Sequence, residues 1–186
     1  MMKTKDYRFN TELFKSFIGK NLNKYKHKKF LYTNTVTMFV GFMVDNVSYE
    51  ISNDFEEVEY FGWDDEATVC RVSETPWSEI LNGEDDICET SLNQNIIGIT
   101  IINDCYTSKS YGNIDYEWKE TRAIIFKLAN TELMFEKQDC FFSMEFEIRI
   151  GHNLIDTVDD GKKILDDFEQ SDKQTIEVQR EIIELN

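Results

Sequence analysis

Three apolar-rich runs between residues 120 and 152 constrain the fold of this chain more than any other feature. They read RAIIFKL, TELMFE and CFFSMEFEIRI, and the breaks between them, at 129–130 and 137–139, are only two and three residues long. Breaks this short join antiparallel strands, because a parallel connection needs a crossover of a dozen or more residues. The region therefore predicts an antiparallel meander.

Alternating apolar side chains predict further strands on the N-terminal side of this meander. Residues 36–44 carry two interleaved apolar sets, which predicts a strand covered on both faces. The Asp-Asn pair at 45–46 is a turn signal, so this strand is expected to form a hairpin with residues 47–52. The almost wholly apolar IIGITII at 96–102 predicts a central strand, with a bulge or a close approach at Gly98.

Weaker patterns complete the predicted sheet. ATVCRVS at 67–73 predicts a short strand, and TIEVQREIIEL at 175–185 fits a strand better than a helix. Three polar or acidic segments are interpreted mainly as connections between strands: 53–66, 74–95 and 103–120.

Two segments carry a helical pattern instead. In residues 10–26, apolar side chains recur at three- and four-residue intervals, and Asn10 or Thr11 can serve as the N-cap. Residues 158–170 favour a second, shorter helix. The sequence therefore predicts an α+β fold in a single domain of residues 1–186. This fold is a mainly antiparallel β-sheet of meanders and hairpins with an N-terminal helix and a short helix in the C-terminal region.

The spacing of the cysteines argues against a fold that is stabilised by a structural metal site. The four of them lie 18, 17 and 35 positions apart, with no CxxC pair and only two histidines to join them. Structural zinc sites usually take ligands in close pairs, so buried free thiols in a reducing cytoplasm are the expected state. The first residues, MMKTKDYRFN, contain no apolar segment typical of a secretion signal. We expect a cytoplasmic protein without a cofactor.

Charge is distributed unevenly along the chain. Residues 1–30 hold nine basic and two acidic residues, a net of +7, while the remaining 156 residues have a net charge of −23. Residues 1–30 are therefore interpreted as a basic helical leader packed on an acidic, β-rich body of residues 31–186. The lysines in the last part of this leader either contact nucleic-acid phosphates or pair with acids of the same chain, and the second interpretation is favoured. These lysines are Lys24, Lys26, Lys28 and Lys29.

The most unusual stretch is residues 45–90, which contain fifteen acids and the single base Arg71. Aromatic residues lie among the acids, and aromatic anchors surrounded by acids suit a surface that docks onto a basic partner. A solvated face that only keeps the protein soluble is the competing interpretation. The candidate partner-binding residues are Glu56, Glu57, Glu59, Trp63, Asp64, Asp65, Glu66, Trp77, Glu84, Asp85 and Asp86.

Motifs for catalysis are absent from the sequence. It has no GxSxG, no HExxH and no glycine-rich phosphate loop. The places to look for a Cys/His pair are Cys105 and His152. The acidic runs 64–66 and 84–86 could hold Mg²⁺ or Ca²⁺, but neither has the spacing of an EF-hand. We therefore expect no catalytic residue and no bound metal.

These features favour a non-enzymatic inhibitor that occupies a basic, nucleic-acid-binding surface of a protein target. Nuclease-toxin immunity proteins and anti-CRISPR or other anti-defence proteins are analogous in class, although no shared motif links this chain to either group. The carboxylates would mimic phosphates, and Trp63 and Trp77 would be the anchors. Two alternatives remain open: a small metal-dependent hydrolase or nuclease that uses acidic residues, and a homo-oligomeric structural module.

Overall fold

The computed structural model describes residues 3–60, 63–138, 141–161 and 174–186, and these are mostly β-strand. Neighbouring strands run antiparallel, except that β1 pairs in parallel with β8. The elements are β1 (Lys3–Tyr7), α1 (Thr11–Lys15), β2 (Asn21–Lys28), β3 (Val36–Thr37), β4 (Val40–Val44), β5 (Val47–Tyr60), β6 (Trp63–Glu74), β7 (Ile87–Ser110), β8 (Asn113–Leu128), β9 (Glu132–Lys137), β10 (Phe146–Gly151), the 3₁₀ turn η1 (Leu154–Thr157) and β11 (Gln174–Leu185).

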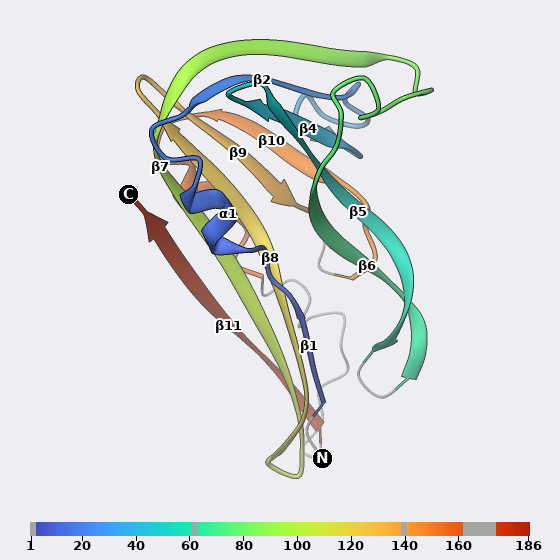
Figure 1. The fold of residues 1–186 in the computed structure, drawn as a ribbon. Helices are drawn as coiled ribbons and strands as arrows, with labels where there is room; N and C mark the ends of the chain where they lie inside the picture. The colour runs from blue at the N-terminus through green and yellow to red at the C-terminus, as the bar shows by residue number, and fades with distance from the viewer. Residues whose placement is uncertain (1–2, 61–62, 139–140, 162–173) are drawn as a thin grey trace.

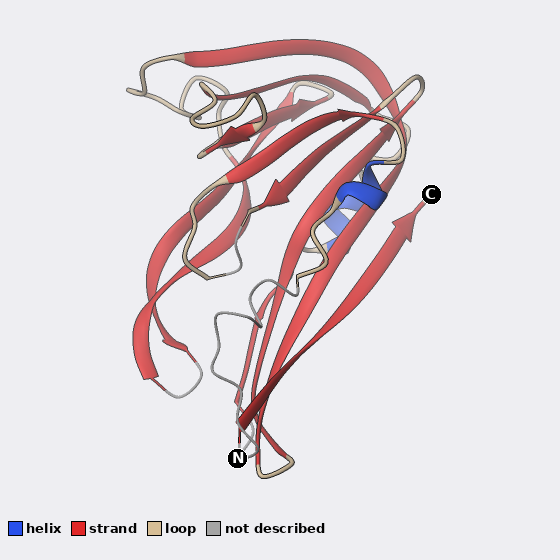
Figure 2. Ribbon diagram, turned by 180° about the vertical axis from the view of Figure 1, so that it is seen from behind, coloured by secondary structure: helices blue, strands red, loops and turns tan. Residues whose placement is uncertain are grey.

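One long strand, β7, connects two layers of sheet. Its first part, residues 87–95, pairs with β2, and the rest pairs with β8 on one side and β11 on the other. Layer B therefore consists of β2, β4, β5, β6 and the start of β7, while layer A holds the other strands. Figure 1 shows β7 arching across the top of the molecule before it turns down into layer A, and Figure 2 shows the same bend from behind.

The far edge of layer B returns to layer A. The backbone N–H of Thr68 in β6 donates to the carbonyl oxygen of Phe141 at 2.8 Å, and Asn53 Nδ2 donates to the Ser143 carbonyl oxygen at 2.7 Å. The segment between β9 and β10 thus borders β6, and the sheet curls back on itself. This curvature encloses the main core.

Aromatic side chains fill the space between the layers. Phe14 and Phe17, from α1 and the turn after it, pack with Phe42 of β4 and with Phe126 and Phe135 of layer A. A second cluster, centred on the buried Trp118, Tyr106 and Phe141, lies between β7–β8 and the β5–β6 hairpin. A third cluster, covered by η1, lies on the other face of layer A around Ile102, Ile125 and Met134.

An ion pair is buried next to the second cluster. Lys137 Nζ lies 2.8 Å from Glu120 Oε2, and each side chain is 1% exposed. Lys137 also donates to the Thr68 carbonyl oxygen at 3.1 Å, and Trp118 Nε1 donates to Glu120 Oε2 at 3.2 Å. Burial raises the pKa of Glu120, and the positive charge of Lys137 opposes that shift.

Several strand predictions are confirmed. The meander forms β8, β9 and the later part of the third run, β10. The predicted turn at 45–46 joins β4 to β5 with positive φ at both residues, 47° and 72°, as a two-residue hairpin turn requires. The register of β7 shifts between Ile96 and Gly98, where a bulge was expected, and the last run is strand β11.

The α+β prediction is wrong, because residues 10–26 do not form one helix. Asn10 does cap α1, accepting from the Glu12 backbone N–H at 3.0 Å, but α1 ends at Lys15. Gly19 then adopts a φ of +81°, and β2 begins at Asn21. A bulge between Leu22 and Lys24 puts an extra residue into β2.

That bulge explains the misleading sequence pattern. It brings Leu22 and Tyr25, three positions apart, to the same core, so the strand imitates helical spacing. The described part of the chain contains no helix in its C-terminal region beyond the 3₁₀ turn η1: residues 158–161 are irregular, and the rest of the predicted helix at 158–170 lies outside the described residues. The fold is therefore a mainly antiparallel β-protein.

The polar segments interpreted as connections are also largely strand. Residues 53–60 and 63–66 extend β5 and β6, residues 87–95 begin β7, and residues 103–120 form most of a β7–β8 hairpin. Many of their charged side chains are exposed, although Asp104 and Glu120 are buried, and apolar alternation is weak in these segments. No helix in the described residues is long and apolar enough to cross a membrane.

The thiols differ in their surroundings. Cys70, Cys88 and Cys105 are free. Cys70 is buried, which raises the pKa of its thiol to about 12, but Cys88 is exposed and Cys105 half-buried, so the prediction of buried thiols holds only in part. Cys140 lies outside the described residues.

Candidate functional site

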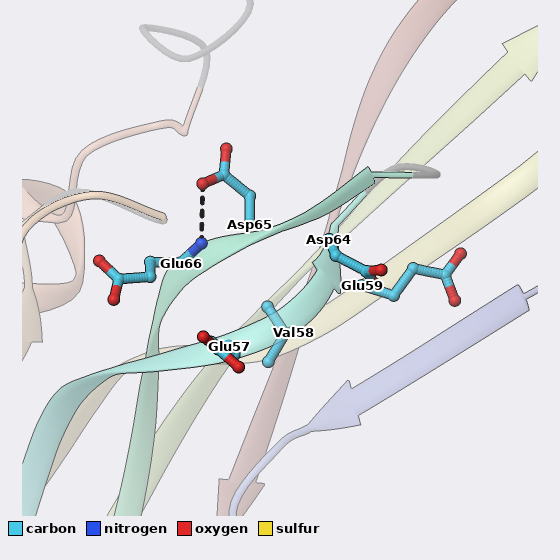
Figure 3. Close-up of a pocket in the computed structure, with 6 residues that line it drawn as sticks. All are labelled: Glu57, Val58, Glu59, Asp64, Asp65 and Glu66. Carbon is cyan, nitrogen blue, oxygen red and sulfur yellow. Dashed lines mark hydrogen bonds between the residues drawn. The ribbon is translucent and has the colours of Figure 1, made fainter.

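The outer face of the β5–β6 hairpin collects acids from both strands. Glu57 lies opposite Glu66, and Glu59 lies opposite Asp64. Residues that are directly opposed, and residues two apart on one strand, project to the same face of a sheet. These four carboxylates therefore share one face of the hairpin, and we call them the acidic face. Figure 3 shows Asp64 and Glu59 extending to the same side of the ribbon.

Bases of the chain neutralise the acidic face only in part. Glu59 forms an ion pair with Lys3 of β1. Among the described residues, no base lies within ion-pair distance of Glu57, Asp64 or Glu66, and these three side chains are exposed. Like charges placed directly opposite one another destabilise a strand pair. The hairpin thus keeps charges that work against its own folding.

The other face of the same hairpin is used for packing. Val58 lies in the second core cluster with Ala67. Glu56, which projects to this side, forms an ion pair with Arg71 at 2.7 Å. An open pocket of about 500 Å³ surrounds the tip of the hairpin and is lined by Glu57, Val58, Glu59, Asp64, Asp65 and Glu66 (Figure 3).

Asp65 and Trp63 belong to β6, the strand that also carries Asp64 and Glu66. Asp65 Oδ1 accepts a hydrogen bond from the Glu66 backbone N–H at 2.8 Å. Trp63 begins β6, opposite Tyr60 in the register. The structure thus gathers seven of the eleven predicted partner-binding residues on one hairpin.

The other four candidates lie elsewhere, on residues 75–86, which we call the strap. The strap crosses the outer face of layer B, where Ile80 packs on Gly41 of β4 and is 1% exposed. Glu84 forms an ion pair with Lys28 at 2.5 Å, and the Asp86 carbonyl oxygen accepts from the Lys29 backbone N–H at 2.8 Å. The candidate residues on the strap are Trp77, Glu84, Asp85 and Asp86.

Trp77 holds the strap against β2. Lys24 Nζ and Lys26 Nζ each lie 4.5 Å from the centre of its indole ring, and Lys26 also donates to its carbonyl oxygen at 2.6 Å. Glu89 completes the group by accepting from Lys24 at 2.7 Å, and this hydrogen bond lowers the pKa of Glu89. Lysines of the basic leader therefore contact acids and an aromatic ring of the same chain.

Replacing Trp77 with alanine should lower the free energy of unfolding by about 1–2 kcal/mol, because two cation–π contacts and part of the strap's packing are lost. The same variant should keep its affinity for any partner of the acidic face. Urea unfolding and a binding titration measure the two effects. Tyr32→Ala is the matched control, since Tyr32 is 81% exposed. A large loss of affinity without a loss of stability would show instead that Trp77 contacts the partner directly.

Cys105 and His152 are the residues considered for a Cys/His pair. Cys105 Sγ lies 3.9 Å from Thr107 Oγ1, and no hydrogen bond joins Cys105 to His152 in the part of the chain described here. Asp104 is held by Arg180 through two hydrogen bonds of 2.7 Å. Across residues 3–60, 63–138, 141–161 and 174–186, no group of three or more His, Cys, Asp or Glu side chains is arranged to hold a metal ion.

Sequence reasoning missed two exposed aromatic residues: Phe55, two residues before Glu57 on β5, and Phe142, in the segment between β9 and β10. Phe55 of β5 is 46% exposed and Phe142 is 53% exposed. Both lie in segments interpreted as core-facing or connecting, and only the tertiary structure shows that they face solvent.

Comparisons with protein-family models, with curated proteins and with solved structures gave no significant match.

Proposed function

We propose that this protein is a non-enzymatic inhibitor that occupies a basic, nucleic-acid-binding surface of a protein target. The observation that carries the proposal is the acidic face, where two like-charged pairs lie directly opposite one another. Such pairs cost folding stability, and a basic partner would remove that cost when it binds. The carboxylates of the acidic face would then repel one another until a basic partner binds.

The way the chain distributes its bases supports the same proposal. Lys24, Lys28, Lys109 and Lys127 form ion pairs with acids outside the hairpin. Of the four acids in the acidic face, only Glu59 pairs with a base of the described chain. The acidic face is one of the places where this arrangement leaves exposed negative charge, and such charge can steer a basic partner during encounter.

Carboxylates in this arrangement can act as phosphate mimics. Side chains two residues apart on a strand are separated by about 6.5–7 Å, and the opposing strand adds a second row. A target surface lined with lysine and arginine would meet regularly spaced negative charges of the kind it meets on nucleic acid. The expected partner is a nuclease or a CRISPR effector, and the protein would compete with that partner's nucleic acid.

Reversing three charges of the acidic face, Glu57→Lys, Asp64→Lys and Glu66→Lys, should weaken binding to such a partner about 100-fold. Each lost contact contributes about 1 kcal/mol and each introduced lysine adds repulsion. The matched control reverses three exposed acids outside the hairpin tip, Glu74, Glu79 and Asp85, and so changes the net charge equally. Equal loss of affinity in both variants would mean that only net charge matters.

The partner is sought with a panel of purified nucleases and CRISPR effectors, at about 0.1 M and about 0.5 M salt. Screening shortens the reach of surface charges at the higher salt, so an acid-driven complex should be lost there. Added nucleic acid should displace this protein from the same partner. Failure to bind any basic target at either salt would contradict the proposed function.

A further inference from the structure

Strand β11 ends layer A with an edge that no other strand of the described residues covers. It pairs with β7 on one side only, from Gln174 opposite Ser110 to Leu185 opposite Ile99. Figure 1 shows β11 along the left border of the molecule and Figure 2 along the right border, with no ribbon drawn beyond its C-terminal half. An uncovered edge presents backbone N–H and C=O groups that can pair with another strand.

This edge lacks the features by which proteins usually prevent such pairing. Short edge strands, lysine, proline and bulges are the common protections. β11 is twelve residues long, contains no lysine and no proline, and keeps one unbroken register with β7. In addition, Ile182 places an apolar side chain that is 50% exposed on this strand.

The residues around Ile182 are complementary to a second copy of themselves. Arg180, Ile182 and Glu184 follow one another at intervals of two, so all three side chains project to the same face of the strand. In an antiparallel pair with a two-fold axis between Ile182 and its own copy, Arg180 of each chain lies opposite Glu184 of the other. Directly opposed Cβ atoms are about 4.5–5.5 Å apart, so the isoleucines would touch and the opposite charges attract. Centring the axis on Arg180, Glu181 or Glu184 would instead set a like charge opposite its own copy.

Both charged residues keep polar atoms for these contacts. Arg180 donates to Asp104 through Nε and Nη2, and Glu184 accepts from Thr100 and Lys127 through Oε2. Within the described residues, Nη1 of Arg180 and Oε1 of Glu184 make no hydrogen bond. The pattern of charge therefore favours a second copy of this chain as the occupant of the edge.

We propose that this protein forms a symmetric dimer in which β11 pairs with β11 of a second copy about an axis at Ile182. Residues 179–185 of the two copies pair with one another, and layer A continues from one copy into the other as one sheet. The β5–β6 hairpin lies on the opposite side of the molecule from β11, so both acidic faces stay exposed in the dimer (Figure 1). The dimer does not depend on the proposed function.

Sedimentation velocity of the full-length chain between about 5 and about 300 µM tests the proposal. The paired stretch is short and each copy has a net charge of −16, so we expect a dissociation constant on the order of 10–100 µM. Ile182→Lys would place two lysines opposite one another and should raise this constant at least about tenfold. Ile150→Lys is the matched control, because Ile150 of β10 is 49% exposed and the substitution adds the same charge. A monomer throughout the series, or a dimer that Ile182→Lys does not weaken, would overturn the proposal.

Disulfide crosslinking tests the register and gives a second variant if Ile182→Lys unfolds. With copper phenanthroline as the added oxidant, Ile182→Cys should form a covalent dimer, because its two thiols would face one another across the axis. Gln179→Cys lies on the same strand and is also exposed, but its two copies would be about 20 Å apart. It should crosslink no faster than the wild type, which gives the background from the native cysteines. Equal crosslinking of the two variants would contradict an axis at Ile182.

Discussion

Replacing Lys137 with methionine should lower the free energy of unfolding by about 3–5 kcal/mol, the largest single effect we expect in this protein. Methionine keeps most of the side-chain volume but removes the cation that lies 2.8 Å from Glu120. Glu120 is fully buried, so its carboxylate would lose the cation that directly compensates its charge. Urea unfolding of the wild type and the variant measures the difference.

The loss should depend on pH, and its direction follows from the protonation of Glu120. Without Lys137, the folded state holds a neutral Glu120, because burial raises the pKa of this carboxyl. The unfolded state releases that proton above its ordinary pKa of 4.5. The folded variant therefore binds more protons than the unfolded chain, and its stability falls as pH rises, by up to about 1.4 kcal/mol per pH unit.

The double variant Lys137→Met/Glu120→Gln provides the matched control. It removes both charges, and the amide introduced at this position would still offer an oxygen to the Trp118 indole N–H. A buried ion pair that is replaced as a unit often costs little, so the double variant should recover most of the lost stability. It should also lose the additional pH dependence. A single variant that loses less than about 1 kcal/mol would contradict a buried, paired Glu120.

Replacing Gly41 with valine should destabilise the protein by about 3 kcal/mol, even though valine favours strands. A Cβ atom built on Gly41 would lie 2.6 Å from Cγ2 and 3.2 Å from Cδ1 of Ile80. Ile80 is buried and branched, so it cannot swing into solvent without lifting the strap from layer B. The steric cost should therefore exceed the gain in strand propensity.

The rescue experiment for Gly41 uses Ile80 itself. Adding Ile80→Ala to Gly41→Val creates room for the new side chain, so the pair of substitutions should cost less than the sum of the two single changes. Thermal unfolding of the four proteins measures this coupling. If the two effects simply add, Gly41 and Ile80 do not pack against one another in the way described.

The sequence predicted the strands whose apolar residues face a core. The meander that forms β8 to β10, the hairpin at 45–46 and the central part of β7 all carry strong apolar or turn signals, because burial and left-handed turn geometry restrict the residue types there. The concentration of acid between residues 45 and 90 was equally visible. Charge and local periodicity are properties of the chain itself.

Tertiary structure alone decided which neighbours each of these residues meets. The bulge in β2 placed Leu22 and Tyr25 in one core at helical spacing, so local periodicity predicted the wrong element there. Trp77 resembles an exposed anchor in the sequence, but two lysines of β2 lie against its ring and hold it on layer B. A periodic pattern of apolar residues indicates only that the environment repeats along the chain. It does not reveal a single residue inserted by a β-bulge, or a contact with a side chain distant in the sequence.

For the candidate site, too, some features follow from the sequence and others only from the tertiary structure. The sequence by itself determined that this protein has a strongly acidic segment with aromatic residues and a basic leader. Only the folded chain decided that Glu57 and Glu66 oppose one another with no base of the described residues at ion-pair distance, and that the segment after β9 borders β6. The physical reason is that strand register and the curl of the sheet arise from long-range contacts, which bring together residues that share no local pattern.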